Sequence, residues 1–404
     1  MKELKINNSI IIIKSWVYPW INEYYQYIVS LLKLIINKNN LSINIILGDL
    51  DYNFHNENKT IKIGINYEHT LVKKNGRGIE PNTQVGKIIY DQTQHYLVRI
   101  ENFNQLNSCD IVIDYSIPNI FNVKESELFD DFSKKHIYIA PSLYKKNIEK
   151  RERTIHSLTT FLNVNEPRRK ALLEKISKSN LNHINRNNCF DANVLEEVYK
   201  NTKILINIHQ TPHHDTFEEL RCLPALQNGV IVVAEKSPLI HLIPYNDLII
   251  WSDYDNIIEK TAEVLENYDD YFKKIFTNEN IELLYKMDDK NKNNLEDKII
   301  NCSYEDKKII VYIHVACLNN YEEIFNNLIK CIKESDLYDA VDEIRCGVLG
   351  IQSENFKNII NEHTKLKIVI EDEDLKLYES FTLNKMIEDS KIENSYILYL
   401  HTKG

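Results

Sequence analysis

The segment from Ile204 to Glu235 contains several side chains that could bind a ligand or take part in a reaction. Its loop and the helix after it carry three histidines, two glutamates and an arginine, namely His209, His213, His214, Glu218, Glu219 and Arg221. Imidazole, carboxylate and guanidinium groups can bind phosphate and sugar hydroxyls or move protons. Three histidines also suggest zinc, but their spacing matches no zinc pattern and no fourth ligand is evident. The segment is therefore predicted to be the functional site without a metal.

Two buried strands and a helix must position these groups. Ile204 to Ile208 and Val230 to Ala234 are continuous apolar runs, typical of parallel strands covered on both faces. Asp215 or Thr216 is expected to cap the helix between them, and Gly229 to end it. Ligands of open parallel sheets bind at the loops that leave the strand ends. An exposed polar loop is the alternative, and it applies better to His213 and His214 than to His209, which ends a strand.

Arginines at the start of another predicted helix form a second candidate group. Arg168 and Arg169 follow Pro167, which favours the first turn of a helix. The N-terminus of a helix and cationic side chains both bind phosphate, so a diphosphate could bind here. The alternative is that the two arginines only form a solvated basic helix start. Arg221 could likewise reach a phosphate, or pair with Glu218 on its own helix.

A base is expected from the first part of the chain. Glu68 and His69 follow the predicted strand Thr60 to Ile65, and Asp114 ends the apolar run at 110–114. A carboxylate beside an imidazole can accept a proton near neutral pH. The alternative is a structural pair that braces the loop from Lys73 to Gly78.

Composition limits the function classes. The chain has 404 residues, 43% of them hydrophobic, and a formal net charge of −10. That size predicts two or three globular domains, and the acidic balance argues against a surface made mainly for nucleic acid. The seven cysteines show no CxxC spacing, which favours scattered thiols in a reducing compartment. No apolar stretch reaches the length of a membrane span.

The alternation of strands and helices predicts three α/β units, at 1–150, 151–285 and 300–404. The first is expected to be a doubly wound parallel sheet with helices on both faces. Charged stretches at 145–153 and 288–297 are expected to be linkers. The chain stops directly after the predicted strand Tyr396 to Leu400, so the third unit is expected to be truncated.

The second unit resembles the donor-binding domain of GT-B glycosyltransferases of the group-1 type. The resemblance lies in IHSLTTFLNVNEPRRKALLEKI, which starts at Ile155, and in ILINIHQ…FEELR…ALQNG…VVAE. Pro224 stands where many members carry the Glu that holds the nucleotide ribose, and Glu218 or Glu219 could substitute. The first unit, with INYEHTLVKKNGRG and DIVIDYSIPNI, is similar to N-terminal domains of such proteins in large DNA viruses and bacteria. The third unit, with IVYIHVACLNN and YILYLHTKG, resembles the start of a GT-A-type domain.

The resemblance implies two facing Rossmann-like domains followed by a partial GT-A-like domain. It implies transfer of a sugar from a nucleotide-diphosphate sugar to a glycan or glycoconjugate acceptor in the cytoplasm, the host's if the protein is viral. The GT-B module would need no cofactor, whereas a complete GT-A-like domain could need a divalent metal. The alternatives are a GT-B-type sugar-nucleotide epimerase and a non-catalytic nucleotide- or glycan-binding scaffold. The candidate catalytic residues are Glu68, His69 and Asp114, and the candidate donor-binding residues are Arg168, Arg169, His209, Glu218, Glu219 and Arg221.

Overall fold

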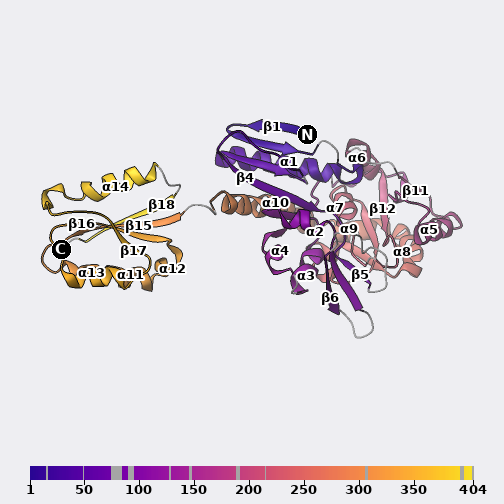
Figure 1. Cartoon of the computed structure of the whole chain (residues 1–404). Coiled ribbons are helices and arrows are strands. Elements are labelled where there is room, and N and C mark those ends of the chain that lie inside the picture. Colours follow the sequence, from indigo (N-terminus) through magenta and orange to yellow (C-terminus); the bar gives the residue numbers. More distant parts are fainter. Residues whose placement is uncertain are drawn as a thin grey trace. The chain divides into compact units, whose positions relative to one another are not determined.

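The structure, a computed structural model, describes residues 1–14, 17–48, 50–73, 84–89, 95–126, 129–144, 148–187, 192–213, 215–304, 308–391 and 395–402. The chain divides into two compact units, Met1–Ser303 and Tyr304–Gly404 (Figure 1). The larger unit contains two parallel sheets, called here the first and the second sheet, and the smaller unit contains a third. The protein is thus a mixed α/β protein with several parallel sheets.

The first sheet has the strand order β1-β2-β3-β4-β8-β9. All its strands are parallel except β1, which pairs with β2 in an antiparallel hairpin. The five parallel strands lie in chain order, so this sheet lacks the reversal of strand order that a doubly wound sheet has. Its strands are β1 Lys2–Ile6, β2 Ser9–Ile13, β3 Ile43–Leu47, β4 Lys59–Asn66, β8 Ile111–Asp114 and β9 His136–Tyr138.

Both faces of the first sheet are covered, as its buried apolar strands predict. Neighbouring strand residues point to opposite faces. Ile111 packs in the same core as helices α1 and α10, whereas Val112 packs with α2, α3, α4 and a small antiparallel sheet. These elements are α1 Pro19–Asn39, α2 Phe103–Asn107, α3 Ile117–Glu125, α4 Asp130–Lys135, α10 Asn278–Tyr304, and the small-sheet strands β5 Leu71–Lys73, β6 Gln84–Ile89 and β7 His95–Ile100.

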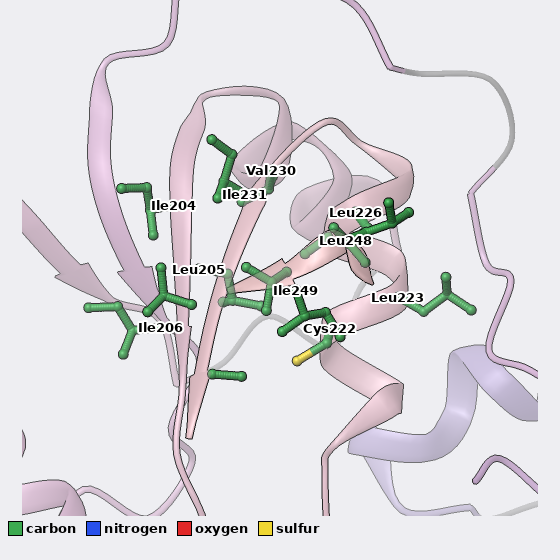
Figure 2. Close-up of a cluster of buried hydrophobic side chains, with 14 of the residues drawn as sticks. Ile204, Leu205, Ile206, Cys222, Leu223, Leu226, Val230, Ile231, Leu248 and Ile249 are labelled. Carbon is green, nitrogen blue, oxygen red and sulfur yellow. The ribbon is translucent and has the colours of Figure 1, made fainter. Parts of the chain in front are cut away.

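The second sheet is entirely parallel, with the order β11-β10-β12-β13-β14. Its order reverses at β10, because β11 lies on one side of β10 and β12 on the other. Figure 2 shows the apolar core that β12, β13, β14 and α7 share, in which the helix contributes Cys222, Leu223 and Leu226. The elements are β10 Ile155–Thr159, α5 Pro167–Ser177, β11 His183–Asn185, α6 Ala192–Lys200, β12 Thr202–Asn207, α7 Glu219–Gln227, β13 Ile231–Glu235, β14 Ile249–Ser252, α8 Ile257–Glu266 and α9 Tyr268–Ile275.

The predicted linker at 288–297 is wrong. These residues lie inside α10, a continuous helix of 27 residues. Leu295 and Ile299 are fully buried in the core of the first sheet, and the amide of Asn291 both donates to and accepts from the backbone of Ala140. The helix therefore fastens the end of the second-sheet region onto the first sheet.

The smaller unit has one parallel sheet with the order β17-β16-β15-β18. Phe325 of α11 and Phe356 of α13 are fully buried, and their rings meet edge-on with centroids 5.1 Å apart, which fixes these two helices over one core. The elements are β15 Lys308–Ala316, α11 Tyr321–Glu334, α12 Leu337–Ala340, β16 Glu343–Leu349, α13 Glu354–Asn361, β17 Leu366–Asp372, α14 Ser380–Ser390 and β18 Ser395–His401.

Residues 257–275 form two helices, α8 and α9, separated at Asn267. The predicted start of the helix between β12 and β13 is corrected. Asp215 and Thr216 do not begin α7, which starts at Glu219 with Glu218 before it and no side-chain cap. Gly229 follows this helix with a φ of 70°, a conformation that glycine adopts without strain, so the predicted stop is confirmed.

Candidate functional site

The predicted donor-binding residues gather where the order of the second sheet reverses. The carboxyl ends of β10 and β12 lie at the same edge, because the two strands are parallel neighbours. The segment after β10 leads to Arg168 and Arg169 in the first turn of α5, and His209 follows β12 by two residues. Ligands of open α/β sheets bind at such a reversal. The fold therefore brings these candidates together at the expected edge.

Arg168 is held in an ion pair. One guanidinium nitrogen lies 2.6 Å from Glu235 Oε1, and another donates to the carbonyl of His209 at 3.1 Å. The guanidinium also lies 4.2 Å from the centre of the Tyr254 ring. The positive charge of Arg168 is thus balanced by Glu235, and its contacts tie α5 to the ends of β12 and β13.

The imidazole of His209 is almost completely buried. Its Nε2 lies 2.9 Å from the Ser237 hydroxyl, and its Nδ1 lies 3.5 Å from both Asp215 and Glu235. Burial lowers the pKa of His209, although the two carboxylates act in the opposite direction. A neutral imidazole in this position acts as a hydrogen-bonding group rather than as a cation.

Arg169 differs from Arg168 in having no ion-pair partner among the described residues. Its side chain is 3% exposed and its guanidinium lies 4.9 Å from the centre of the Phe161 ring. Burial, and then the positive charge of Arg221, lower the pKa of Arg169 to about 10, so it stays charged at neutral pH. Within the described residues its Nε has no hydrogen-bond acceptor, and neither Arg169 nor Arg221 forms an ion pair. Glu218 and Glu166 act on this buried cation only from beyond ion-pair distance, so its burial is costly, and an anionic ligand would offset that cost.

Glu218 and His69 meet across the two sheets of the larger unit. Glu218 Oε2 lies 3.8 Å from His69 Nε2, and the Tyr115 hydroxyl lies 3.2 Å from His69 Nδ1. Burial lowers the pKa of His69, Glu218 acts in the opposite direction, and Arg99 and Arg221 lower it further. The predicted base region of the first sheet is therefore next to the unpaired arginines of the second.

Glu68 is the most accessible of the predicted catalytic residues. Its side chain is 37% exposed, and its Oε2 lies 3.7 Å from a guanidinium nitrogen of Arg99. Burial and the neighbouring carboxylate of Glu101 raise the pKa of Glu68 to about 7, while Arg99 opposes the change. Water screens part of this effect, since more than a third of the side chain is exposed. A pKa raised in this direction is what a general base that works near neutral pH needs.

Asp114 is fully enclosed. Its carboxylate accepts hydrogen bonds from the amides of Asn66 at 2.6 Å and Asn119 at 3.1 Å, and lies 2.9 Å from His136 Nε2. The same two amides donate to the carbonyl of Glu68 at 3.1 and 3.2 Å. Asp114 therefore fixes the turn that carries Glu68, and its own oxygens are directed away from solvent.

Glu219 is also enclosed. Its Oε2 accepts from the hydroxyls of Tyr245 at 2.7 Å and Tyr138 at 2.9 Å, and none of the residue is exposed. Burial raises the pKa of Glu219 to about 7, although both tyrosine hydrogen bonds act in the opposite direction. Tyr138 ends β9 of the first sheet, so this carboxyl group links the two sheets rather than facing a ligand.

Asp215, predicted to cap a helix, instead links the second sheet to the small antiparallel sheet. Its Oδ2 accepts from the Tyr96 hydroxyl at 2.9 Å and lies 3.2 Å from Lys73 Nζ. The backbone N–H of Lys73 donates to the carbonyl of His213 at 3.0 Å. His214 and the loop after Lys73 lie outside the described residues. Tyr96 and Lys73 carried no sequence signal for these contacts.

The described residues contain neither a cluster suited to a metal ion nor a helix that could cross a membrane. No group of three or more His, Cys, Asp or Glu side chains in that part of the chain could hold a metal ion. No helix among the same residues is both long enough and apolar enough to cross a membrane.

Comparison with known proteins gave viral relatives. An uncharacterised protein of Acanthamoeba polyphaga mimivirus is 27% identical over 287 residues, which span 66% of this chain and 90% of that protein. A second uncharacterised mimivirus protein is 29% identical over 177 residues, covering 42% of this chain and 22% of that protein. No protein-family model matches the chain.

Among solved structures, the crystal structure of TarM aligns with 68% of this chain at a TM-score of 0.34 and 12% sequence identity. The chain spans 58% of the length of TarM, which is less than two thirds. A likeness at this level carries no argument about function. The function must be argued from the residues of the site itself.

Proposed function

We propose that residues 1–303 form a glycosyltransferase of the GT-B type, which transfers a sugar from a nucleotide-diphosphate sugar to a hydroxyl of a glycan acceptor. One observation carries this proposal. Two arginines that form no ion pair among the described residues, Arg169 and Arg221, lie near His69 and Glu218, which come from the two different sheets. An anion-binding group beside a group able to move a proton is what the reaction requires.

The donor diphosphate binds to Arg169 and Arg221 in this proposal. A phosphate would give Arg169 a direct ion-pair partner and relieve the repulsion that Arg221 exerts on it. Arg168 has a supporting role, because Glu235 already balances its charge. The position at the reversal of strand order, together with the sequence resemblance of this region to donor domains, supports the same assignment.

Glu218 takes the place of the ribose-binding carboxylate in this proposal. Pro224, which stands where the family carries that Glu, lies buried inside α7. Glu219 is fully buried and both tyrosine hydroxyls bond its Oε2, so its carboxyl group does not face a ligand. Glu218 is partly exposed and lies among the same charged groups as Arg169, which makes it the better candidate.

Glu68 serves as the base that deprotonates the acceptor, with His69 beside it. The carboxyl group of Glu68 is accessible, and its pKa is raised towards neutrality. Asp114 is withdrawn from solvent and acts through Asn66 and Asn119 on the Glu68 backbone. It is therefore proposed as a positioning residue and not as the base.

Titration with nucleotides tests the donor site. UDP and GDP are titrated by calorimetry into the full chain and into Arg169→Ala, Arg221→Ala and Lys178→Ala. Loss of one charge-assisted phosphate contact should weaken binding by about 1.5–3 kcal/mol, or roughly 10- to 150-fold. Lys178 is the control, since it is exposed and lies at the opposite end of α5.

Unchanged affinity in both arginine variants would place the donor site elsewhere. Product analysis with UDP- and GDP-sugars then separates the reaction classes. A transferase releases the nucleoside diphosphate and extends an acceptor, and Glu68→Gln should slow this step by about 10²–10⁴-fold. An epimerase changes the configuration of the sugar without any acceptor, and a scaffold binds without turnover.

A further inference from the structure

An exposed aromatic pair stands at the entrance to helix α1. Trp20 is 49% exposed and Tyr18 is 37% exposed. Their rings stack with centroids 4.5 Å apart and planes inclined by 18°. The ring of Tyr67 meets Tyr18 edge-on, with centroids 6.1 Å apart. These three residues are called the aromatic platform below.

The backbone of the platform is rigid. Pro19 lies in the first turn of α1 and fixes its own φ, and it restricts Tyr18 before it to an extended conformation, observed at φ −53° and ψ 133°. Ile21, directly after Trp20, is 1% exposed and anchors the helix in the core. A ligand on the rings would therefore cost little backbone ordering.

The platform adjoins the proposed acceptor base. The segment that carries Tyr18 follows β2, and Tyr67 follows β4, so both leave the carboxyl edge of the first sheet. Tyr67 is bonded to Glu68 in the chain, and it packs against the same core as Leu220 of α7. The platform thus leaves the same sheet edge as Glu68, and Tyr67 shares a core with the helix that begins directly after Glu218 and carries Arg221.

Aromatic rings of this kind match the chemistry of a sugar. One face of a pyranose ring presents C–H groups that pack on an aromatic face, while its hydroxyls stay hydrated or meet polar tips. Tyr and Trp combine an apolar body with a polar tip, so they suit such a mixed ligand. A purely apolar partner would gain nothing from the adjacent carboxyl group of Glu68.

We propose that Tyr18, Trp20 and Tyr67 bind a sugar ring of the acceptor saccharide and present its hydroxyl to Glu68. This inference rests on the proposed function, because it assigns the acceptor subsite of the same reaction. It makes the acceptor a saccharide with at least one ring beyond the reacting hydroxyl.

Saturation-transfer NMR on the full chain tests the platform. The probes are maltotriose, cellotriose and chitotriose, together with octyl β-glucoside, which carries both a sugar ring and an alkyl chain. Ring protons of at least one trisaccharide should receive saturation. Trp20→Ala should weaken that saccharide roughly tenfold through the lost stacking. The control is Leu34→Ala, since Leu34 lies on the same helix and is 48% exposed, and it should bind as the wild type does.

Three results would overturn the inference: no ring signal from any trisaccharide, equal saccharide binding by Trp20→Ala, or saturation confined to the alkyl chain of octyl β-glucoside. Because Trp20 is half exposed, its replacement should leave the UDP or GDP affinity of the same sample unchanged, which confirms folding. If the protein binds nucleotide but no saccharide, the saccharide-binding role of the platform is wrong and the transferase proposal stands. If it binds saccharide but no nucleotide, the role of the platform stands and the transferase proposal is wrong.

Discussion

Replacement of Glu219 by Gln should stabilise the larger unit, and more strongly as the pH rises. Burial raises the pKa of this carboxyl group from an ordinary 4.5 to about 7. A carboxyl group whose pKa is raised in the folded state binds its proton more tightly there than in the unfolded chain. Its contribution to stability is therefore complete below about pH 4.5 and is lost as the pH rises through about 7. The free-energy difference between these values is about 3 kcal/mol.

The Gln side chain keeps an oxygen that can accept from Tyr138 and Tyr245, but it cannot ionise. The wild type should lose about 2 kcal/mol more than Glu219→Gln between pH 5.5 and 8.5, because most of the titration falls in that interval. Other groups that titrate there, including His69 and His209, are present in both proteins and largely cancel in the difference.

Urea unfolding followed by tryptophan fluorescence measures this difference. All three tryptophans lie within residues 1–303, so the signal reports on the larger unit alone. Glu282→Gln is the matched control, because Glu282 is an exposed carboxylate paired with Lys286 and should show no gain at high pH. A stability difference between Glu219→Gln and the wild type that stays constant from pH 5.5 to 8.5 would refute the reasoning.

Three further substitutions test the electrostatics and the packing. Arg169→Met removes a buried cation that forms no ion pair among the described residues and should raise the free energy of unfolding by about 1–3 kcal/mol in the absence of nucleotide, measured by the same urea assay. Asp114→Asn removes the carboxylate that Asn66, Asn119 and His136 contact and should lower it by about 1.5–3 kcal/mol. Gly347→Ala would bring a Cβ into overlap with the Thr382 hydroxyl, so circular dichroism should show earlier unfolding, by about 1–3 kcal/mol, while tryptophan fluorescence stays unchanged.

The strands were predictable where burial on both faces dictates composition. Ile111–Asp114 and Ile231–Glu235 consist almost entirely of apolar residues, and each forms an interior strand of its sheet. The strand at Lys2–Ile6 was missed, because charged residues alternate with apolar ones on an exposed edge. Residues 288–297 were misjudged for a related reason. Most of their charged side chains are at least partly exposed, on a helix whose buried side is marked only by widely spaced residues such as Leu295.

The candidate site was predictable in its residues but not in its pairing. Parallel strands bring Glu68, from one sheet, and Glu218, from another, to neighbouring edges, although 150 positions separate them. The hydrophobic periodicity of the sequence identifies the carboxyl end of each strand separately. It does not predict which sheet edges come together in the fold. The Tyr138 and Tyr245 hydroxyls that enclose Glu219 illustrate the limit, because neither tyrosine stands near Glu219 in the sequence.

Arg168 and Arg169 show what the structure adds to a basic pair. Both stand in the first turn of α5, and the sequence gives them the same possible role. The fold pairs Glu235 with Arg168, whereas Arg169 packs on the Phe161 ring and has no ion-pair partner among the described residues. Stability alone would favour a neutral side chain at the second position, since burial of an unpaired charge opposes folding. An anionic ligand that binds to Arg169 would explain why a guanidinium stands there despite that cost. Arg169 also lies at the edge where the second sheet reverses its strand order, which is where ligands of such sheets bind.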